Sequence, residues 1–172
     1  MNAQAESEFT AFVDDSWRSL VRAAIFLGAS PSDADDIAQT TVIRCYSGWE
    51  KVSGADNRDA YVYRMLLHCL RDHQRTSWWR LRSPHPPSPD RAEVGLDESV
   101  RIEMADAVHR ALAILPRAQR EVVVLRYFVQ LTEAQTAATL GIAAGTVKSR
   151  LSRSLARLAE DPHLLDLTGG PR

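Results

Sequence analysis

The sequence has little of what metal-binding, redox and membrane-spanning proteins require. It has two cysteines, Cys45 and Cys69, and neither has a second thiol or other ligand at metal-binding or redox spacing. Both lie in helical patterns, so buried free thiols are expected. No apolar run approaches the ~20 residues of a membrane span, and the first residues lack the basic and apolar segments of a signal peptide. We therefore expect a cytoplasmic protein that does not contact a membrane.

Groupings of catalytic side chains are also missing. Asp72 and His73 are adjacent in a helical pattern, so their side chains point in different directions. His68 and His73 are five residues apart, which does not place both on one helix face. No nucleophile or metal-ligand set accompanies them. The sequence therefore predicts no enzyme, no metal site and no cofactor.

The net charge is small, at −1, but the charges are arranged in blocks of alternating sign. Residues 1–57 carry −5, residues 58–82 carry +4, residues 83–106 carry −4 and residues 117–159 carry +5. Only local fields matter for phosphate contact, because charges beyond a Debye length are largely screened at physiological salt. Two basic blocks favour two contacts with nucleic acid. The acidic first block indicates either a basic partner or a solvated surface.

Apolar residues recur at helical spacing along most of the chain, and no strand pattern is convincing. We predict an all-α fold of two small helical domains joined by a flexible linker, the second domain containing a helix-turn-helix. Helices are expected at residues 7–27, 32–48, 58–79 and 99–115, with a loop at residues 50–57. Four prolines and a glycine interrupt residues 82–97. The predicted segments are a first domain at 1–81, a linker at 82–98, a second domain at 99–162 and a tail at 163–172.

Residues 131–158 have the pattern of a helix-turn-helix. Thr132 and Gln135 fit a capping box at the first helix start, and Gly141 fits its end. The second helix has a predicted buried stripe of Val147, Leu151, Leu155 and Leu158. Residues 143–159 contain four basic side chains and no acidic one. This arrangement is typical of a helix that presents donors to base edges and phosphates, although a helical hairpin with a solvated basic face is the alternative.

The third predicted helix combines basic and aromatic residues. Its shared face is predicted to carry Tyr61, Arg64, His68, Arg71 and Arg75, and Trp78 and Trp79 follow near its end. Cations that track a backbone and rings that stack on bases suit single-stranded nucleic acid. A surface helix with ion pairs is the alternative interpretation.

Taken together, these segments resemble the extracytoplasmic-function sigma factors of bacterial RNA polymerase, in their two-domain form. Residues 33–41, DADDIAQTT, resemble the acidic helix of that family. Tyr63-Arg64 and residues 72–75, DHQR, resemble its next conserved helix, and residues 115–127 resemble the approach to its second DNA-binding region. Residues 145–151, GTVKSRL, resemble its recognition helix. The matches extend over nearly all of residues 7–160.

The resemblance implies a promoter-specificity subunit that binds core RNA polymerase and promoter DNA. An anti-sigma factor is a further candidate partner. The implied polymerase contacts are Asp36, Gln39 and Arg44. The implied contacts to the −10 element are Asn57, Tyr61, Arg64, His68, Arg71 and Arg75. The implied contacts to the −35 element are Arg126, Thr146, Lys148, Ser149, Arg150 and Arg153.

Some positions depart from the family pattern. Thr40 stands where glutamate is usual, His68 where asparagine is common, and Ala143 where proline is usual. Leu155 stands where arginine is frequent, which narrows the basic face. Two alternatives remain open from the sequence. One is a free-standing helix-turn-helix regulator that binds duplex DNA as a dimer without polymerase, and the other is an interaction module whose basic helices dock on an acidic protein.

Overall fold

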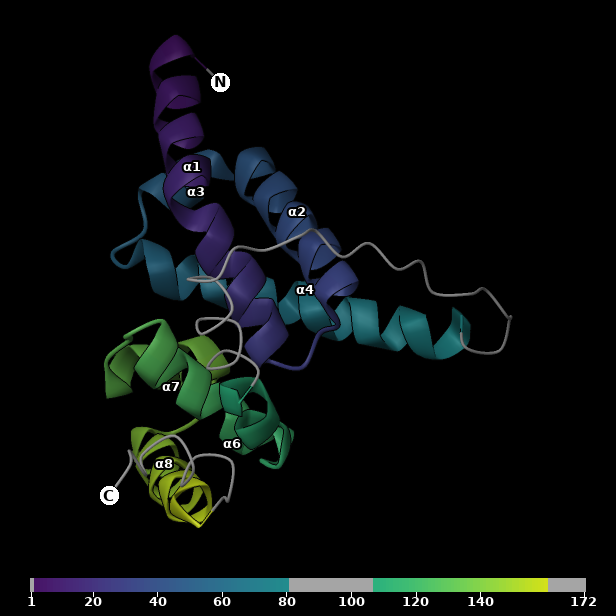
Figure 1. The fold of residues 1–172 in the computed structure, drawn as a ribbon. Coiled ribbons are helices and arrows are strands. Elements are labelled where there is room, and N and C mark those ends of the chain that lie inside the picture. The colour runs from purple at the N-terminus through teal and green to yellow at the C-terminus, as the bar shows by residue number, and fades with distance from the viewer. Residues whose placement is uncertain (1, 81–106, 161–172) are drawn as a thin grey trace, which may run out of the picture.

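The computed structural model describes residues 2–80 and 107–160, and these residues form helices and turns without a strand (Figure 1). The predicted all-α fold is confirmed. The predicted linker at 82–98 and tail at 163–172 lie outside the described residues, so the domain boundaries stay predictions. Within the described ranges, no helix combines the length and apolar character needed to cross a membrane.

The first two helices begin at side-chain caps. Helix α1 spans Ala3–Phe26, and the side chain of Asn2 accepts a hydrogen bond from the Ala5 amide. It starts four residues before the predicted helix because this cap satisfies its first turn. Helix α2 spans Pro31–Ser47, with Ser30 as its cap and proline at its first position. Gly28 joins the two helices with φ of 104°, a conformation that favours glycine.

The predicted loop at residues 50–57 is partly wrong, because a short helix, α3, spans Trp49–Ser53. Trp49 and Val52 are buried three residues apart, and this burial stabilises a single turn that is too short to show a sequence period. Helix α4 follows at Arg58–Arg80. The Asn57 side chain accepts from the Ala60 amide at 2.6 Å and so caps α4.

The second group of helices begins with helical residues 107–113, followed by α6 at Arg117–Val123. A π-helix, η1, continues directly over Val124–Phe128. The amide of Val129 donates to the carbonyl of Val124, five residues earlier, at 3.1 Å. Helix α7 spans Glu133–Leu140 and helix α8 spans Ala144–Ala159.

The two groups of helices pack against each other. Figure 1 shows α7 next to α4, with α8 on the far side of α7. The rings of Phe26 and Phe128 lie 4.4 Å apart, centre to centre, and join the two groups in one apolar core. Arg71 of α4 donates to both carboxylate oxygens of Glu121 of α6 at 3.3 Å. A β-carbon at Gly28 would clash with the guanidinium of Arg120, so glycine also permits close approach here.

Candidate polymerase and nucleic-acid interfaces

The helix-turn-helix prediction holds in its local geometry. The Thr132 hydroxyl accepts from the Gln135 amide at 3.2 Å, and Gln135 Oε1 accepts from the Thr132 amide at 2.7 Å, which completes the capping box. Gly141 ends α7 in the left-handed conformation with φ of 67°. Helix α8 then begins at Ala144, and the residue before it, Ala143, provides no side-chain cap. A short helix, a tight turn and a longer second helix are therefore present where the sequence predicted them.

The predicted buried stripe of α8 is wrong at one position. Val147 is buried and Leu151 and Leu158 are half-buried, but Leu155 is 39% exposed. Ser154 is buried instead, and its hydroxyl donates to the Arg150 carbonyl at 2.7 Å. At ~100° per residue, position 154 lies about 20° from Val147 around the helix, whereas position 155 lies about 80° away. Helical geometry therefore turns Ser154 inward, although leucine is the more apolar residue.

The solvent side of α8 presents an organised row of donors. Lys148, Ser149 and Arg153 are exposed, and Thr146 and Arg150 are half-buried. The Ser149 hydroxyl donates to the Thr146 carbonyl at 3.1 Å. Arg153 Nε donates to the Ser149 carbonyl at 3.1 Å, and its Nη2 donates to the Ser149 hydroxyl oxygen at 3.4 Å. The structure therefore brings Thr146, Ser149 and Arg153 together on one face.

Arg126, the remaining predicted −35 contact, has a different environment. It belongs to η1, is half-buried, and donates from Nη1 to the carbonyl of Leu131 at the entrance to the helix-turn-helix. Its Nε atom is buried without a hydrogen-bond partner among the described residues. Its hydrogen bond thus supports the turn before α7 rather than extending from the recognition face.

The six predicted −10 contacts divide into two groups. Tyr61, Arg64, His68 and Arg75 are exposed on α4. The other two have partners inside the molecule, because Asn57 caps α4 and Arg71 pairs with Glu121. Arg75 also pairs with Asp72, one turn earlier on the same helix, at 3.3 Å. The side chains of Trp78 and Trp79 lie outside the described residues.

Two polar contacts join α4 to the predicted polymerase-binding helix. Asp72 accepts from Arg44 of α2 at 3.2 Å, and His73 lies 3.0 Å from Asp33 at the start of α2. Arg44 is therefore engaged within the molecule. Asp36 and Gln39 are exposed, and neither forms a hydrogen bond or ion pair with another described residue. Of the three predicted contacts, these two remain open to a partner.

Sequence analysis missed two residues on the same face of α2. Ile43 is 58% exposed and Tyr46 is 48% exposed, which is unusual for large apolar side chains on a well-packed helix. Positions 36, 39, 43 and 46 are separated by three, four and three residues, so all four share one helix face. This spacing was visible in the sequence. The exposed face of α2 therefore combines an acidic, an amide and two apolar side chains.

Comparison with known proteins shows which family carries these surfaces. Residues 13–80 match the family described as Sigma-70 region 2, and residues 105–158 match the family described as Sigma-70, region 4. The chain is 37% identical over 169 residues to the RNA polymerase sigma-E factor of Streptomyces coelicolor, covering 93% of this chain and 89% of the relative. The chain belongs to the extracytoplasmic-function sigma factors. The sequence-based identification is thereby confirmed.

Other relatives agree with this family assignment. The ECF RNA polymerase sigma factor SigM of Mycobacterium tuberculosis is 34% identical over 147 residues, covering 83% of this chain and 70% of that protein. The solved structure of CnrH in complex with the cytosolic domain of CnrY matches with a TM-score of 0.66 and 26% identity, covering 97% of this chain and 96% of CnrH. The sigma factor RpoE of Bartonella quintana, solved with the anti-sigma factor NepR, shares the fold at a TM-score of 0.70 and 24% identity, covering 89% and 95% of the two chains.

Proposed function

We propose that this sigma factor binds core RNA polymerase through α2 and directs initiation at promoters whose −10 and −35 elements it contacts through α4 and α8. The single observation that carries the proposal is the hydrogen-bonded row of Thr146, Ser149 and Arg153 on the solvent side of the second helix of a helix-turn-helix. It lies in the segment that matches Sigma-70, region 4. Sigma factor function explains why this chain has both the row on α8 and the matches to Sigma-70 region 2 and region 4.

At the −35 element, α8 is expected to enter the major groove. Helix-turn-helix proteins contact base edges mainly through the first turns of the second helix. Thr146, Lys148, Ser149 and Arg150 lie in those turns, and Arg153 lies one turn further along. A hydroxyl donates to or accepts from several bases, whereas an arginine donates to the two acceptors of guanine or to phosphates. We therefore propose that these side chains read the base sequence. The cationic side chains beside them contact phosphates and so position the helix on the DNA.

At the −10 element, α4 is expected to hold unpaired bases. Tyr61 supplies an exposed ring, and Arg64 and His68 follow at helical spacing. Stacking of a base on an aromatic side chain contributes ~1–3 kcal/mol, which helps to offset the cost of unstacking the duplex. This supply of binding energy needs no hydrolysed cofactor. We propose that the protein promotes opening without catalytic chemistry of its own.

The face of α2 defined by Asp36, Gln39, Ile43 and Tyr46 is the proposed contact with core polymerase. Exposed apolar side chains beside a carboxylate suit a protein partner with a basic and apolar surface, and a phosphate backbone would be repelled by Asp36. Arg44 already pairs with Asp72, so we do not count it in this face. The acidic character of residues 1–57 favours the same assignment.

The proposed setting follows from these partners. A protein that acts on RNA polymerase and promoter DNA works in the cytoplasm, so we propose that location. The related structures contain CnrH with the cytosolic domain of CnrY, and RpoE with the anti-sigma factor NepR. An anti-sigma factor is therefore a candidate regulatory partner of this chain as well.

Gel filtration with purified core polymerase tests the proposal against its alternatives. The chain is expected to co-elute with the core enzyme, and the complex is expected to retain DNA that carries both promoter elements. A free-standing regulator would bind DNA but elute apart from polymerase. A module for acidic proteins would bind promoter DNA without the steep salt dependence that counterion release produces. Either of these results would overturn the proposal.

A further inference from the structure

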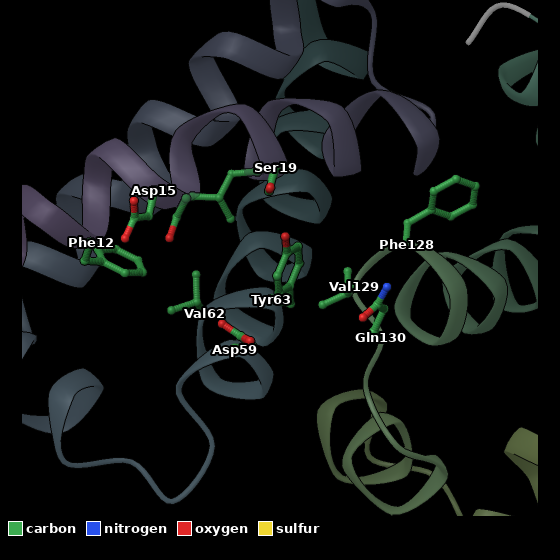
Figure 2. Close-up of a pocket in the computed structure, with 11 residues that line it drawn as sticks. Phe12, Asp15, Ser19, Asp59, Val62, Tyr63, Phe128, Val129 and Gln130 are labelled. Carbon is green, nitrogen blue, oxygen red and sulfur yellow. The ribbon is translucent and has the colours of Figure 1, made fainter. Parts of the chain in front are cut away.

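A cavity of about 250 Å³ lies where the two groups of helices meet (Figure 2). Helix α1 and helix α4 form two of its sides, and Phe128, Val129 and Gln130 form the third. The cavity thus takes residues from both the region 2 and the region 4 segments. It is open to solvent on the side of the exposed Asp15, Asp59 and Gln130, and it exists only while these segments are packed together.

Tyr63 places a hydroxyl without a partner among the described residues at the surface of this cavity. The residue is 8% exposed, and its hydroxyl forms no hydrogen bond with any residue in the ranges 2–80 and 107–160. Figure 2 shows its ring rising from α4 with the hydroxyl directed toward α1. Burial, followed by the nearby charge of Asp59 and opposed by Arg22, raises the pKa of Tyr63 to about 12. A tyrosine phenol is protonated at neutral pH even without this shift, so it can both donate and accept. The ring is buried, whereas the hydroxyl opens onto the cavity and is therefore available to a ligand.

The charged residues that line the cavity are both acidic. Asp15 projects from α1 and Asp59 from α4, and neither forms an ion pair with another described residue. Further oxygen atoms come from Ser16, Ser19 and the amide of Gln130. Among the described residues, Gln130 is the non-glycine residue with positive φ, at 62°. Such a backbone is uncommon for glutamine, and the side chain lies next to Val129 among the lining residues (Figure 2).

The remaining walls are apolar. Phe12, Leu20 and Val62 are buried, and Val129 is half-buried beside them. An apolar wall below two carboxylates fits a hydrocarbon stem that ends in a positive charge, because such groups pack their methylenes and keep the charged end near acceptors. An anion would be repelled by Asp15 and Asp59, and a purely apolar ligand would leave the Tyr63 hydroxyl unpaired.

We propose that this cavity binds an alkylammonium or alkylguanidinium group, with its stem against Phe12, Val62 and Val129 and its charged end between Asp15, Asp59 and the Tyr63 hydroxyl. A lysine or arginine side chain of a partner protein and a free aliphatic diamine share this chemistry. Because the ligand contacts both groups of helices, its binding stabilises the packed arrangement by linkage.

Binding to the full chain can be measured by calorimetry and NMR with two probes. One is a blocked five-residue peptide with a central arginine among alanines, and the other is putrescine. A peptide with neutral citrulline in place of arginine is the control. We expect a Kd on the order of 1 mM for at least one cationic probe, with no detectable binding of the citrulline peptide. Binding of the arginine peptide alone would identify a protein side chain as the natural ligand. Binding of putrescine alone would identify a free diamine.

Conservative variants of the lining residues locate the bound probe. Tyr63→Phe removes only the hydroxyl and Asp59→Asn removes only the charge, so each is expected to weaken binding about tenfold. Asp56→Asn is the matched control, since Asp56 is exposed, lies three residues earlier and does not line the cavity. Failure of both cationic probes to bind, or equal affinity in all three variants, would overturn the proposal.

A variant outside the cavity tests whether the packed arrangement creates the site. Glu121→Ala removes the partner of Arg71 at the contact between α4 and α6 without changing a lining residue. We expect Glu121→Ala to weaken binding of the cationic probe. Arg117→Ala removes only a partner within α6, so it is expected to bind the probe with unchanged affinity. Unchanged affinity in Glu121→Ala, in a sample shown by solution scattering to have opened, would contradict the assignment. These readouts do not depend on transcription, so they remain informative even if the proposed function fails.

Discussion

The side chains proposed to read the −35 element are held in place before DNA arrives. Arg153 donates to both the carbonyl and the hydroxyl oxygen of Ser149, which itself donates to Thr146. An arginine that is already ordered loses less rotamer entropy when it binds. The same hydrogen bonds must break or shift for Arg153 to reach a guanine or phosphate. Helix α8 therefore holds Arg153 in an ordered position, from which its hydrogen bonds can be exchanged for bonds to DNA.

Arg153→Ala is expected to weaken binding of the full chain to a −35 duplex about tenfold, the loss typical of one good arginine contact. Fluorescence anisotropy at fixed salt measures this change. Arg157→Ala is the control, because it removes the same charge one turn further from the start of α8. Equal affinity of Arg153→Ala and the unaltered chain would show that Arg153 does not contact the element.

Asp36→Arg is expected to weaken assembly with core polymerase at least about tenfold, because the acidic face of α2 should meet a basic surface. Titration of labelled chain with core enzyme measures the dissociation constant. Asp35→Arg makes the same charge change at an exposed neighbouring position on a different face of α2. Normal assembly by Asp36→Arg would exclude this contact.

At the residue scale, sequence analysis found the polar faces but could not find their internal partners. Arg71 was expected to face DNA, yet Glu121 engages it from 50 residues away along the chain. Arg126 was likewise expected at the surface and instead donates to Leu131. A tertiary partner leaves no local trace in the sequence. The spacing of Ile43 and Tyr46 from Asp36 was visible, by contrast, and exposure was needed to interpret it.

At the scale of elements, strong local signals predicted the structure well. The capping box at Thr132 and the left-handed Gly141 fix α7 within its predicted bounds. Short or irregular elements were not predictable. The five residues of α3 are fewer than two helical turns. The π-helix η1 differs from an α-helix only in that its hydrogen bonds span five residues instead of four, which composition does not reveal.

Helix α8 lacks one local signal that its neighbours possess. Ala143 has the extended backbone of a cap, with φ of −68° and ψ of 146°, but no side-chain acceptor. Ala143→Ser is expected to raise the free energy of unfolding of the region 4 helices by about 1 kcal/mol. Hydrogen exchange of the α8 amides measures the gain directly.

Ala138→Ser provides the matched control for this substitution. It adds the same hydroxyl at an exposed position inside α7, where serine is slightly less favourable than alanine. A gain in protection that is the same in both variants would contradict a capping effect. No gain at Ala143→Ser would show that water already satisfies the first turn of α8.

At the scale of the whole molecule, the packed arrangement and the proposed DNA complex are different states. Elements centred near −10 and −35 lie about 25 base pairs apart, or roughly 85 Å of B-form duplex at ~3.4 Å per base pair. Helices α4 and α7 are in contact, and Phe26 and Phe128 share one core. The two groups of helices must therefore separate to reach both elements. Separation also releases Arg71, a proposed −10 contact, from Glu121.

Glu121→Ala is expected to shift the free chain toward the separated state, because Arg71 then loses its partner across the contact. Small-angle X-ray scattering should report a larger radius of gyration, with helical content unchanged by circular dichroism. Arg117→Ala leaves the pair between Arg71 and Glu121 in place and should scatter like the unaltered chain. Identical scattering by all three proteins would show that this ion pair does not hold the packed arrangement.

Reconstituted transcription tests the central claim most directly. Purified chain is added to core RNA polymerase on genomic DNA, and the 5′ ends of the transcripts are mapped. The account predicts discrete start sites that depend on the added chain and share sequence elements near −10 and −35. Transcripts whose positions do not change when the chain is omitted would contradict it.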